Sequence, residues 1–201
     1  DSDIEKQIDD IIPTGTVYMG IDPAGEGENE TVWAIRDNYK MRIVAKEKVS
    51  NSKSIAQKTI TLMGHFGIKQ ENVWVDNFGI GANVAQELAL SKIEVNAVNS
   101  GDEPDSEDFL NKRAEMAWRL KQWIRTGGEL VRHGDWKQFL GIRYRRELSG
   151  KMKLMSKLDM AKLGIPSPDA FDAACLTFWR AVDVNVETGM ISSYPEHDDI
   201  N

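Results

Sequence analysis

Runs of strand-forming residues occupy the first quarter of the chain. Such residues fill 16–22 (TVYMGID), 31–37 (TVWAIRD) and 41–49 (MRIVAKEKV), and a Gly-rich loop follows the first run. Valine, isoleucine and aromatic residues favour strands, and short connections between consecutive runs favour antiparallel neighbours. The pattern therefore predicts an antiparallel meander of three strands.

Helical and extended patterns alternate over the rest of the chain. Apolar positions recur at helical spacing in several segments, and short apolar runs lie between them. The predicted elements, in order, are a helix over 52–67, a strand over 72–77, a helix over 81–90, a strand over 93–100, a helix over 109–128 and a helix over 168–182. We expect Ser167 to cap the last helix and Pro168 to occupy its first position. A meander followed by alternating helices and strands predicts an α/β fold with a mixed sheet.

Size and composition exclude several classes of protein. With 201 residues and 41% apolar content the chain can bury a sizeable core, which excludes a disordered protein. No uninterrupted apolar stretch approaches the roughly 18 residues of a membrane helix, and the first residues lack signal-peptide character. The single cysteine, Cys175, excludes an internal disulfide and a Cys-rich zinc site. We therefore expect a cytoplasmic protein without a membrane segment, and the lack of an initiator methionine suggests a piece of a longer chain.

The net charge of −7 is distributed unevenly. Residues 1–10 carry five acids against one base, and residues 187–201 carry four acids and no base. Residues 112–163 carry 14 Lys or Arg against five Asp or Glu. A basic face of this kind is typical of a protein that binds a phosphate backbone, although charge alone fits an ordinary solvated helical surface equally well. We expect an acidic linker over 1–15, a body over 16–185 and an acidic tail over 186–201.

Two acidic residues end predicted strands. Asp22 follows the first strand, and Asp76 follows the strand that precedes the loop NFGIG. Carboxylates at strand ends on a rigid sheet are suited to hold Mg²⁺, which prefers oxygen ligands. Either residue alone also fits a simple turn.

Asp172 falls within the apolar face of the last predicted helix. At about 100° per residue it lies between Trp179 and Leu176, so an isolated charge there would be costly to bury. We therefore expect a cationic partner or a cleft beside it. Asp169 lies at the edge of the apolar arc, where a favourable interaction with the helix dipole is a sufficient explanation.

Other site types are weak or excluded. The run from Asp76 resembles a dinucleotide-binding turn, but Val84 occupies its third small position. The chain has no GxxxxGK[ST] motif, which excludes a Walker-type ATPase. The scattered histidines and the single cysteine provide neither a zinc constellation nor a Cys/His nucleophile pair.

Four segments carry a resemblance to a known family. They are GIDPAGEGENETV (20–32), VWVDNFGIGANVAQEL (73–88), FLNKRAEMAWRLKQWI (109–124) and KLMSKLDMAKLGIPSPDAFDAACLTFW (153–179). In this order they resemble the nuclease domain of the large subunit of tailed-bacteriophage terminases, over roughly residues 16–182. The resemblance implies a ribonuclease H-like fold, with a mixed sheet flanked by helices. It also implies an enzyme that cuts concatemeric viral DNA during genome packaging. In the family this domain follows an N-terminal packaging ATPase, which the missing Walker motif indicates is absent here.

The resemblance also implies roles for individual residues. Asp22, Asp76 and Asp172 match metal ligands, and Asp169 matches a position that supplies a ligand in some ribonuclease H-like nucleases. Lys157 matches a basic residue near the site that could contact a phosphate. Many relatives have an aspartate in the Gly-rich loop where this chain has Glu28-Asn29-Glu30, so the contribution of that loop stays open.

The implied chemistry is two-metal hydrolysis of a phosphodiester in double-stranded DNA, with Mg²⁺ or Mn²⁺ as the two ions. The implied partners are the ATPase domain, the small terminase subunit and the portal, in the host-cell cytoplasm. One alternative is a non-catalytic ribonuclease H-like module that only grips DNA or a packaging partner. A sugar-kinase-like or actin-like phosphotransferase is a second alternative. It would need another glycine-rich phosphate loop, whereas the glycines after Asp76 lead straight into a helix.

Overall fold

The computed structural model describes residues 15–25 and 30–180. The expected acidic tail, most of the expected linker, and Glu28 and Asn29 lie outside the described residues. The predicted meander is confirmed: β1 (Tyr18–Asp22), β2 (Thr31–Arg36) and β3 (Lys40–Glu47) pair antiparallel in sequence order.

Three further strands complete a mixed sheet of six. β4 (Val73–Asp76) pairs parallel with β1, and β5 (Asn96–Val98) pairs parallel with β4. On the opposite edge, β6 (Glu129–Leu130) pairs parallel with β3. The strand order is β5-β4-β1-β2-β3-β6, so the predicted mixed sheet is confirmed, with β1 near its centre.

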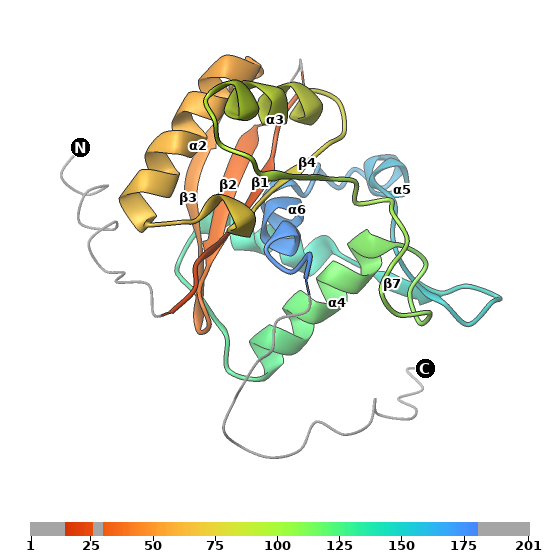
Figure 1. Ribbon diagram of the computed structural model, residues 1–201. Coiled ribbons are helices and arrows are strands. Elements are labelled where there is room, and N and C mark those ends of the chain that lie inside the picture. The colour runs from red at the N-terminus through yellow and green to blue at the C-terminus, as the bar shows by residue number, and fades with distance from the viewer. Residues whose placement is uncertain (1–14, 26–29, 181–201) are drawn as a thin grey trace.

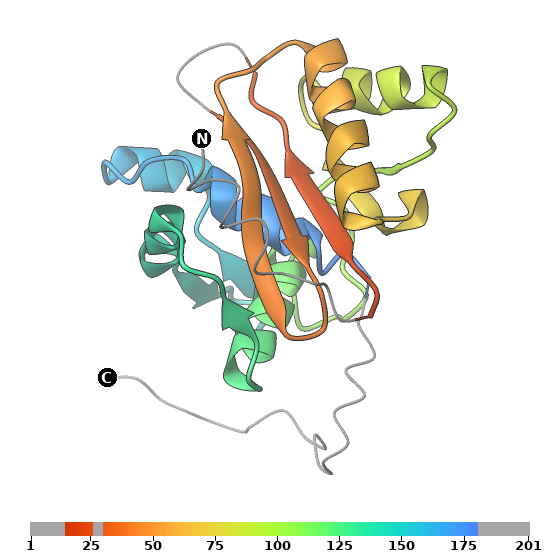
Figure 2. The ribbon, with the colours of Figure 1, turned by 90° about the vertical axis from the view of Figure 1, so that its left-hand side faces the viewer.

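Two helices cover one face of the sheet. They are α2 (Ser52–Phe66) and α3 (Gly81–Leu90), which lie side by side in Figure 1 and on one side of the sheet in Figure 2. The Asn51 side chain caps the start of α2, and Gly67 ends it in the left-handed conformation that glycine tolerates. Trp33 and Val75 belong to the core between this face and the helices.

The other face is covered by α4 (Lys112–Arg125) and α6 (Asp169–Leu176), as Figure 2 shows. α6 packs with its backbone against β1: a Cβ added at Gly20 would lie 2.1 Å from the carbonyl oxygen of Ala173. Glycine at this position therefore lets α6 lie directly on the central strand. This contact fixes how far along β1 the side chains of α6 lie, and so how close they come to the end of that strand.

Several short elements between 130 and 165 were not predicted from the sequence. They are a 3-10 helix over Gly134–Gly141 (η2), a hairpin of β7 (Tyr144–Arg146) and β8 (Met152–Leu154), and α5 (Lys157–Lys162). A further 3-10 turn, η1, covers Gln70–Asn72. The β7–β8 hairpin projects away from the body of the molecule in Figure 1. No described helix combines the length and apolar character needed to cross a bilayer.

Several predicted helix boundaries were wrong. The helix predicted over 109–128 ends at Arg125, and the helix predicted over 168–182 ends at Leu176, with residues 181–182 outside the described residues. α4 begins at Lys112, because the side chain of Asn111 accepts the Ala114 N–H and caps the helix there. In α6 the N-cap position is taken by Pro168, and Ser167 does not cap the helix. Instead, the Gln138 side-chain oxygen accepts the Ala170 N–H, so the cap comes from η2.

Candidate active site

The two strand-end aspartates lie next to each other at the carboxyl ends of two neighbouring parallel strands. β1 and β4 are parallel neighbours, with Ile21 opposite Val75, so Asp22 and Asp76 follow at the same level. Asp22 is 9% exposed, whereas Asp76 is half-buried. The sheet therefore brings together the first two of the predicted site residues.

Asp76 is held by the loops on either side of it. One carboxylate oxygen accepts the Phe78 N–H at 3.1 Å, and the other accepts the Ser100 hydroxyl at 3.1 Å. The start of α3 also approaches closely, because a Cβ on Gly81 would lie 1.7 Å from the Asp76 carbonyl oxygen. These contacts fix the Asp76 side chain at the carboxyl end of β4.

Helix α6 supplies the other two predicted carboxylates. Asp169 and Asp172 are both buried in the first turn of this helix. The Glu30 N–H donates to Asp169 across 3.5 Å, which links α6 to the end of the Gly-rich loop. Because α6 lies on β1 at Gly20, its first turn faces the strand end that carries Asp22.

Asp172 has two cationic partners, as its position within an apolar arc predicted. The Arg113 guanidinium binds one carboxylate oxygen through Nε and Nη2, each at 2.9 Å. Lys157 Nζ lies 2.8 Å from the other oxygen and 3.8 Å from Asp22. Arg113 also donates to the Met155 carbonyl, which ties α4 to the segment that leads into α5. The Lys157 ammonium therefore bridges two of the predicted metal ligands.

The aspartates differ in how well their charges are compensated. Burial raises the pKa of Asp22 to about 8, and the neighbouring carboxylates of Asp172, Asp169 and Asp76 add to this effect while Lys157 opposes it. Burial also disfavours the charge of Asp172, but Arg113 and Lys157 outweigh it and hold that pKa below its usual range. The site therefore favours the ionised form of Asp172 and disfavours the ionised form of Asp22.

All four carboxylates line one cavity of about 560 Å³. The same cavity is lined by Glu30, Ser100 and Asn111 and by the basic side chains of Arg113, Lys153 and Lys157. Within the described residues, no three Asp, Glu, His or Cys side chains form a group placed to hold a metal ion. The donor chemistry nevertheless fits a hard divalent cation, because the acids supply only oxygens and Lys157 compensates the ionised form of the buried Asp22 only in part. One cation, the Lys157 ammonium, already occupies the position between Asp22 and Asp172.

Sequence reasoning missed Arg113 as a member of the site. Lys112 and Arg113 are both in the first turn of α4, where the helix dipole disfavours positive charge. This signal of a need for carboxylate partners depends on the helix start at Lys112, whereas the sequence predicted a start at 109. The partner of Arg113 is Asp172.

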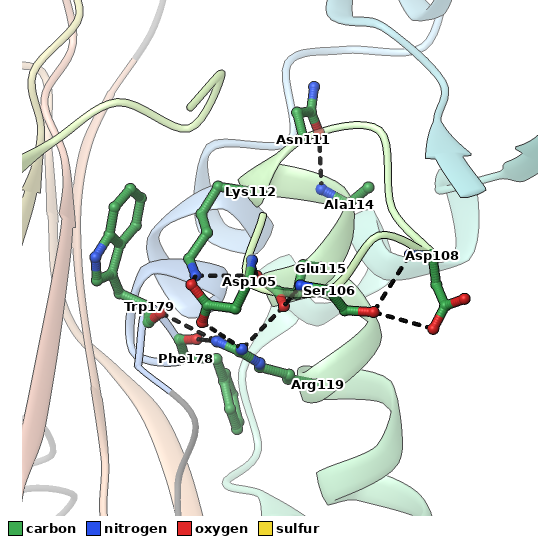
Figure 3. Close-up of polar contacts among 10 residues, drawn as sticks. All are labelled: Asp105, Ser106, Asp108, Asn111, Lys112, Ala114, Glu115, Arg119, Phe178 and Trp179. Atoms are coloured by element: carbon green, nitrogen blue, oxygen red, sulfur yellow. Dashed lines mark hydrogen bonds and ion pairs between the residues drawn. The ribbon is translucent and has the colours of Figure 1, made fainter. Parts of the chain in front are cut away.

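Eight of the 14 basic residues of 112–163 lie at three places in the structure. Arg113, Lys153 and Lys157 line the cavity. Lys112 and Arg119 pair with Asp105 and Glu115 on another side of α4 (Figure 3). Exposed arginines surround the β7–β8 hairpin at Arg143, Arg145 and Arg146. Part of the predicted basic face is therefore used within the protein.

Comparisons with known proteins identify the fold. No protein-family model matches the sequence, and no curated protein matches it either. The nuclease domain of the large terminase subunit gp2 of bacterial virus Sf6 matches with a TM-score of 0.70 and 22% identity, over 87% of this chain and 92% of that chain. A point mutant of that domain, with manganese and beta-thujaplicinol, matches with a TM-score of 0.69 and 22% identity over the same shares. The large terminase nuclease from thermophilic phage G20c with bound magnesium matches with a TM-score of 0.58 and 17% identity, over 82% of this chain and 81% of that chain. The chain therefore has the ribonuclease H-like fold of phage large-terminase nuclease domains, as predicted from the sequence.

Proposed function

We propose that this chain is a terminase large-subunit nuclease domain and cuts double-stranded DNA in a metal-dependent reaction. The observation that carries the proposal is the convergence of four carboxylates from β1, β4 and α6 on one cavity. The fold supports it as well, because similar nuclease domains have been solved with manganese and with magnesium. Family membership agrees with the four sequence segments that resemble terminases.

Asp22, Asp76 and Asp172 would hold two divalent ions, Mg²⁺ or Mn²⁺, and Asp169 would assist. Bound ions of this kind lower the pKa of the attacking water and stabilise the leaving oxygen. Asp22 would be central to this set of ligands, because it lies on β1 between Asp76 on the neighbouring strand and Asp172, with which it shares the Lys157 ammonium. Arg113 holds Asp172 in place through two contacts. Lys157, whose side chain is 49% exposed, can turn from the carboxylates towards a DNA phosphate.

The exposed arginines near the β7–β8 hairpin would hold the duplex through its phosphates, with little reading of base sequence. Binding should weaken steeply with salt, because log K falls by about 0.9 per phosphate neutralised for each decade of salt. Replacing Arg143, Arg145 and Arg146 together with alanine should flatten this slope. An unchanged slope would place the DNA on another surface.

In the packaging machine, this domain would work beside an ATPase domain of the large subunit, the small subunit and the portal, in the host-cell cytoplasm. These partners follow from the proposed family. The alternative function is a non-catalytic module that grips DNA or a packaging partner without cutting.

Plasmid digestion separates the two functions. Supercoiled plasmid should be nicked and linearised with Mg²⁺ or Mn²⁺ and left intact in excess chelator. Asp22→Asn should abolish cutting while DNA binding in a gel-shift assay is retained. Glu94→Gln is the matched control, because Glu94 is an exposed acid outside the cavity. A protein that binds plasmid but never cuts it with either metal would support the non-catalytic module.

A further inference from the structure

A single aromatic ring stands at the mouth of the carboxylate cavity. Phe78 is 86% exposed, although exposing so large an apolar side chain forfeits the free energy of burying it. It lines the cavity together with Asp22, Asp76 and Lys157. The fold does not use this ring in its core, so its position calls for another explanation.

The loop that presents Phe78 is held in one conformation. Asp76 accepts the Phe78 N–H, and the Asn77 N–H donates to the Val98 carbonyl at 2.6 Å. Gly79 adopts a positive φ of 61°, which glycine accommodates without strain. Gly81 then fits against the Asp76 carbonyl, where any larger residue would clash. The ring is therefore attached to a fixed backbone directly beside a predicted metal ligand.

The chemistry of the cavity lining is divided between its elements. Phe78, Gly79 and Ile80, from the loop that joins β4 to α3, contribute an aromatic ring and no charge. Arg113, Lys153 and Lys157, from α4, β8 and α5, contribute positive charge. A nucleotide has the same two components, an anionic phosphate and a flat apolar base.

We propose that Phe78 stacks on a nucleobase adjacent to the phosphate that is cut, so that the site favours DNA with a locally unstacked base. This inference rests on the proposed nuclease function and deepens it. The faces of bases are covered by their neighbours in a regular duplex, so the ring can stack only where the strand is distorted. Such stacking on an aromatic side chain is tolerant of sequence and contributes about 5- to 150-fold to binding per base.

A fluorescent base tests the contact directly. The probe is a short duplex with one bulged 2-aminopurine, whose emission falls when the base stacks, in Ca²⁺ buffer without Mg²⁺ or Mn²⁺. The unmodified protein should quench the probe and bind it about tenfold more tightly than the perfect duplex. Phe78→Trp should keep both effects. Phe78→Ala should lose both, and Phe78→Leu should also lose them because it keeps apolar surface without a π-face.

Leu90→Ala is the matched control, because Leu90 is 74% exposed at the end of α3 and does not line the cavity. It should behave as the unmodified protein in both measurements. Equal quenching by the Phe78→Ala variant and the unmodified protein, or no quenching by either, would overturn the stacking contact. Plasmid cutting with Mn²⁺ is measured on the same samples. If the unmodified protein cuts plasmid and Phe78→Ala leaves quenching and binding of the probe unchanged, the stacking inference fails and the nuclease proposal stands. If the unmodified protein does not cut plasmid, the nuclease proposal fails.

Discussion

Helix α4 takes part in two clusters of charged residues that are built on different principles. The Asp105 network consists of Asp105, Lys112, Glu115 and Arg119, two acids with two bases. The cavity combines four aspartates with the two bases that contact them, Arg113 and Lys157. Lys112 and Arg113 are consecutive, yet they belong to different clusters. The first cluster is balanced, and the second has an excess of negative charge.

The Asp105 network serves the structure. Lys112 and Glu115 are almost fully buried, and Glu115 also accepts the N–H groups of Asp105 and Ser106. Arg119 donates to the carbonyls of Phe178 and Trp179, where the chain leaves α6 (Figure 3). The network thus attaches a loop and the end of α6 to α4. Bonds to Arg119 and Lys112 lower the pKa of Asp105, whereas the pKa of Asp22 in the cavity is raised. The balanced charges of the Asp105 network therefore hold elements together, whereas the excess of acids in the cavity disfavours the ionised form of Asp22.

The largest effect should follow from breaking the balanced cluster. Glu115→Gln leaves Lys112 and Arg119 with a single acid, the exposed Asp105, and should lower the free energy of unfolding by about 3 kcal/mol, because breaking a buried ion-pair network by removing one charge is costly. Urea denaturation measures the loss. Asp108→Asn is the control, since Asp108 is an exposed acid of the same loop, and it should have little effect. A change of less than about 0.5 kcal/mol for Glu115→Gln, the range of ordinary surface substitutions, would show that the network does not serve stability.

The sequence predicted the parts of this comparison that depend on local patterns. The meander and the buried strand before Asp76 follow from runs of strand-forming residues. The parallel pairing of β1 with β4, which the sequence did not predict, then places Asp22 and Asp76 together. The apolar arc around Asp172 predicted that it needs a partner. The identity of that partner depends on how α4 packs against α6, which no local pattern contains.

Other features were missed for the same reason. The β7–β8 hairpin has three-residue strands rich in Arg and Lys, so apolar alternation gave no signal there. The cap of α6 comes from Gln138, which is 32 residues away along the chain. Whether the predicted metal ligands bind metal stays a prediction.

Asp172→Asn should also destabilise the protein, by about 2 kcal/mol at neutral pH. The substitution leaves Arg113 without its carboxylate, although the amide oxygen can still accept one bond. Because the folded pKa of Asp172 is lowered, its contribution exists above the unfolded pKa and is lost as the pH falls through the folded pKa. The difference from the unmodified protein should therefore shrink in acid. Thermal unfolding between pH 3 and pH 8 measures it, and a pH-independent loss would contradict the ion-pair explanation.

Asp22→Asn should have the opposite sign in metal-free protein. With a folded pKa of about 8, Asp22 binds a proton more tightly in the folded than in the unfolded state, so the unmodified protein loses stability as the pH rises from about 4 to about 8. The asparagine variant lacks this loss and should gain stability progressively over that window. One pKa unit is worth about 1.4 kcal/mol, and we expect a gain of at least about this size at pH 8. A variant less stable than its parent at pH 8 in chelator would show that Asp22 is well compensated by Lys157.

Divalent metal should have the smallest effect on stability and should distinguish the two clusters most clearly. Mg²⁺ or Mn²⁺ at about five times its Kd stabilises a protein by about 1 kcal/mol if only the folded state binds it, because the stabilisation is RT ln(1 + [L]/Kd). The shift in melting temperature should be reduced in Asp22→Asn and Asp172→Asn, which each remove one carboxylate from the cavity. The metal-induced shift should be preserved in Glu115→Gln, because Glu115 does not line the cavity and its removal leaves all four aspartates in place. Equal shifts in melting temperature in all three variants would mean that Asp22 and Asp172 do not share a cation site. The contrast between balanced and unbalanced charge would then not explain which cluster binds metal.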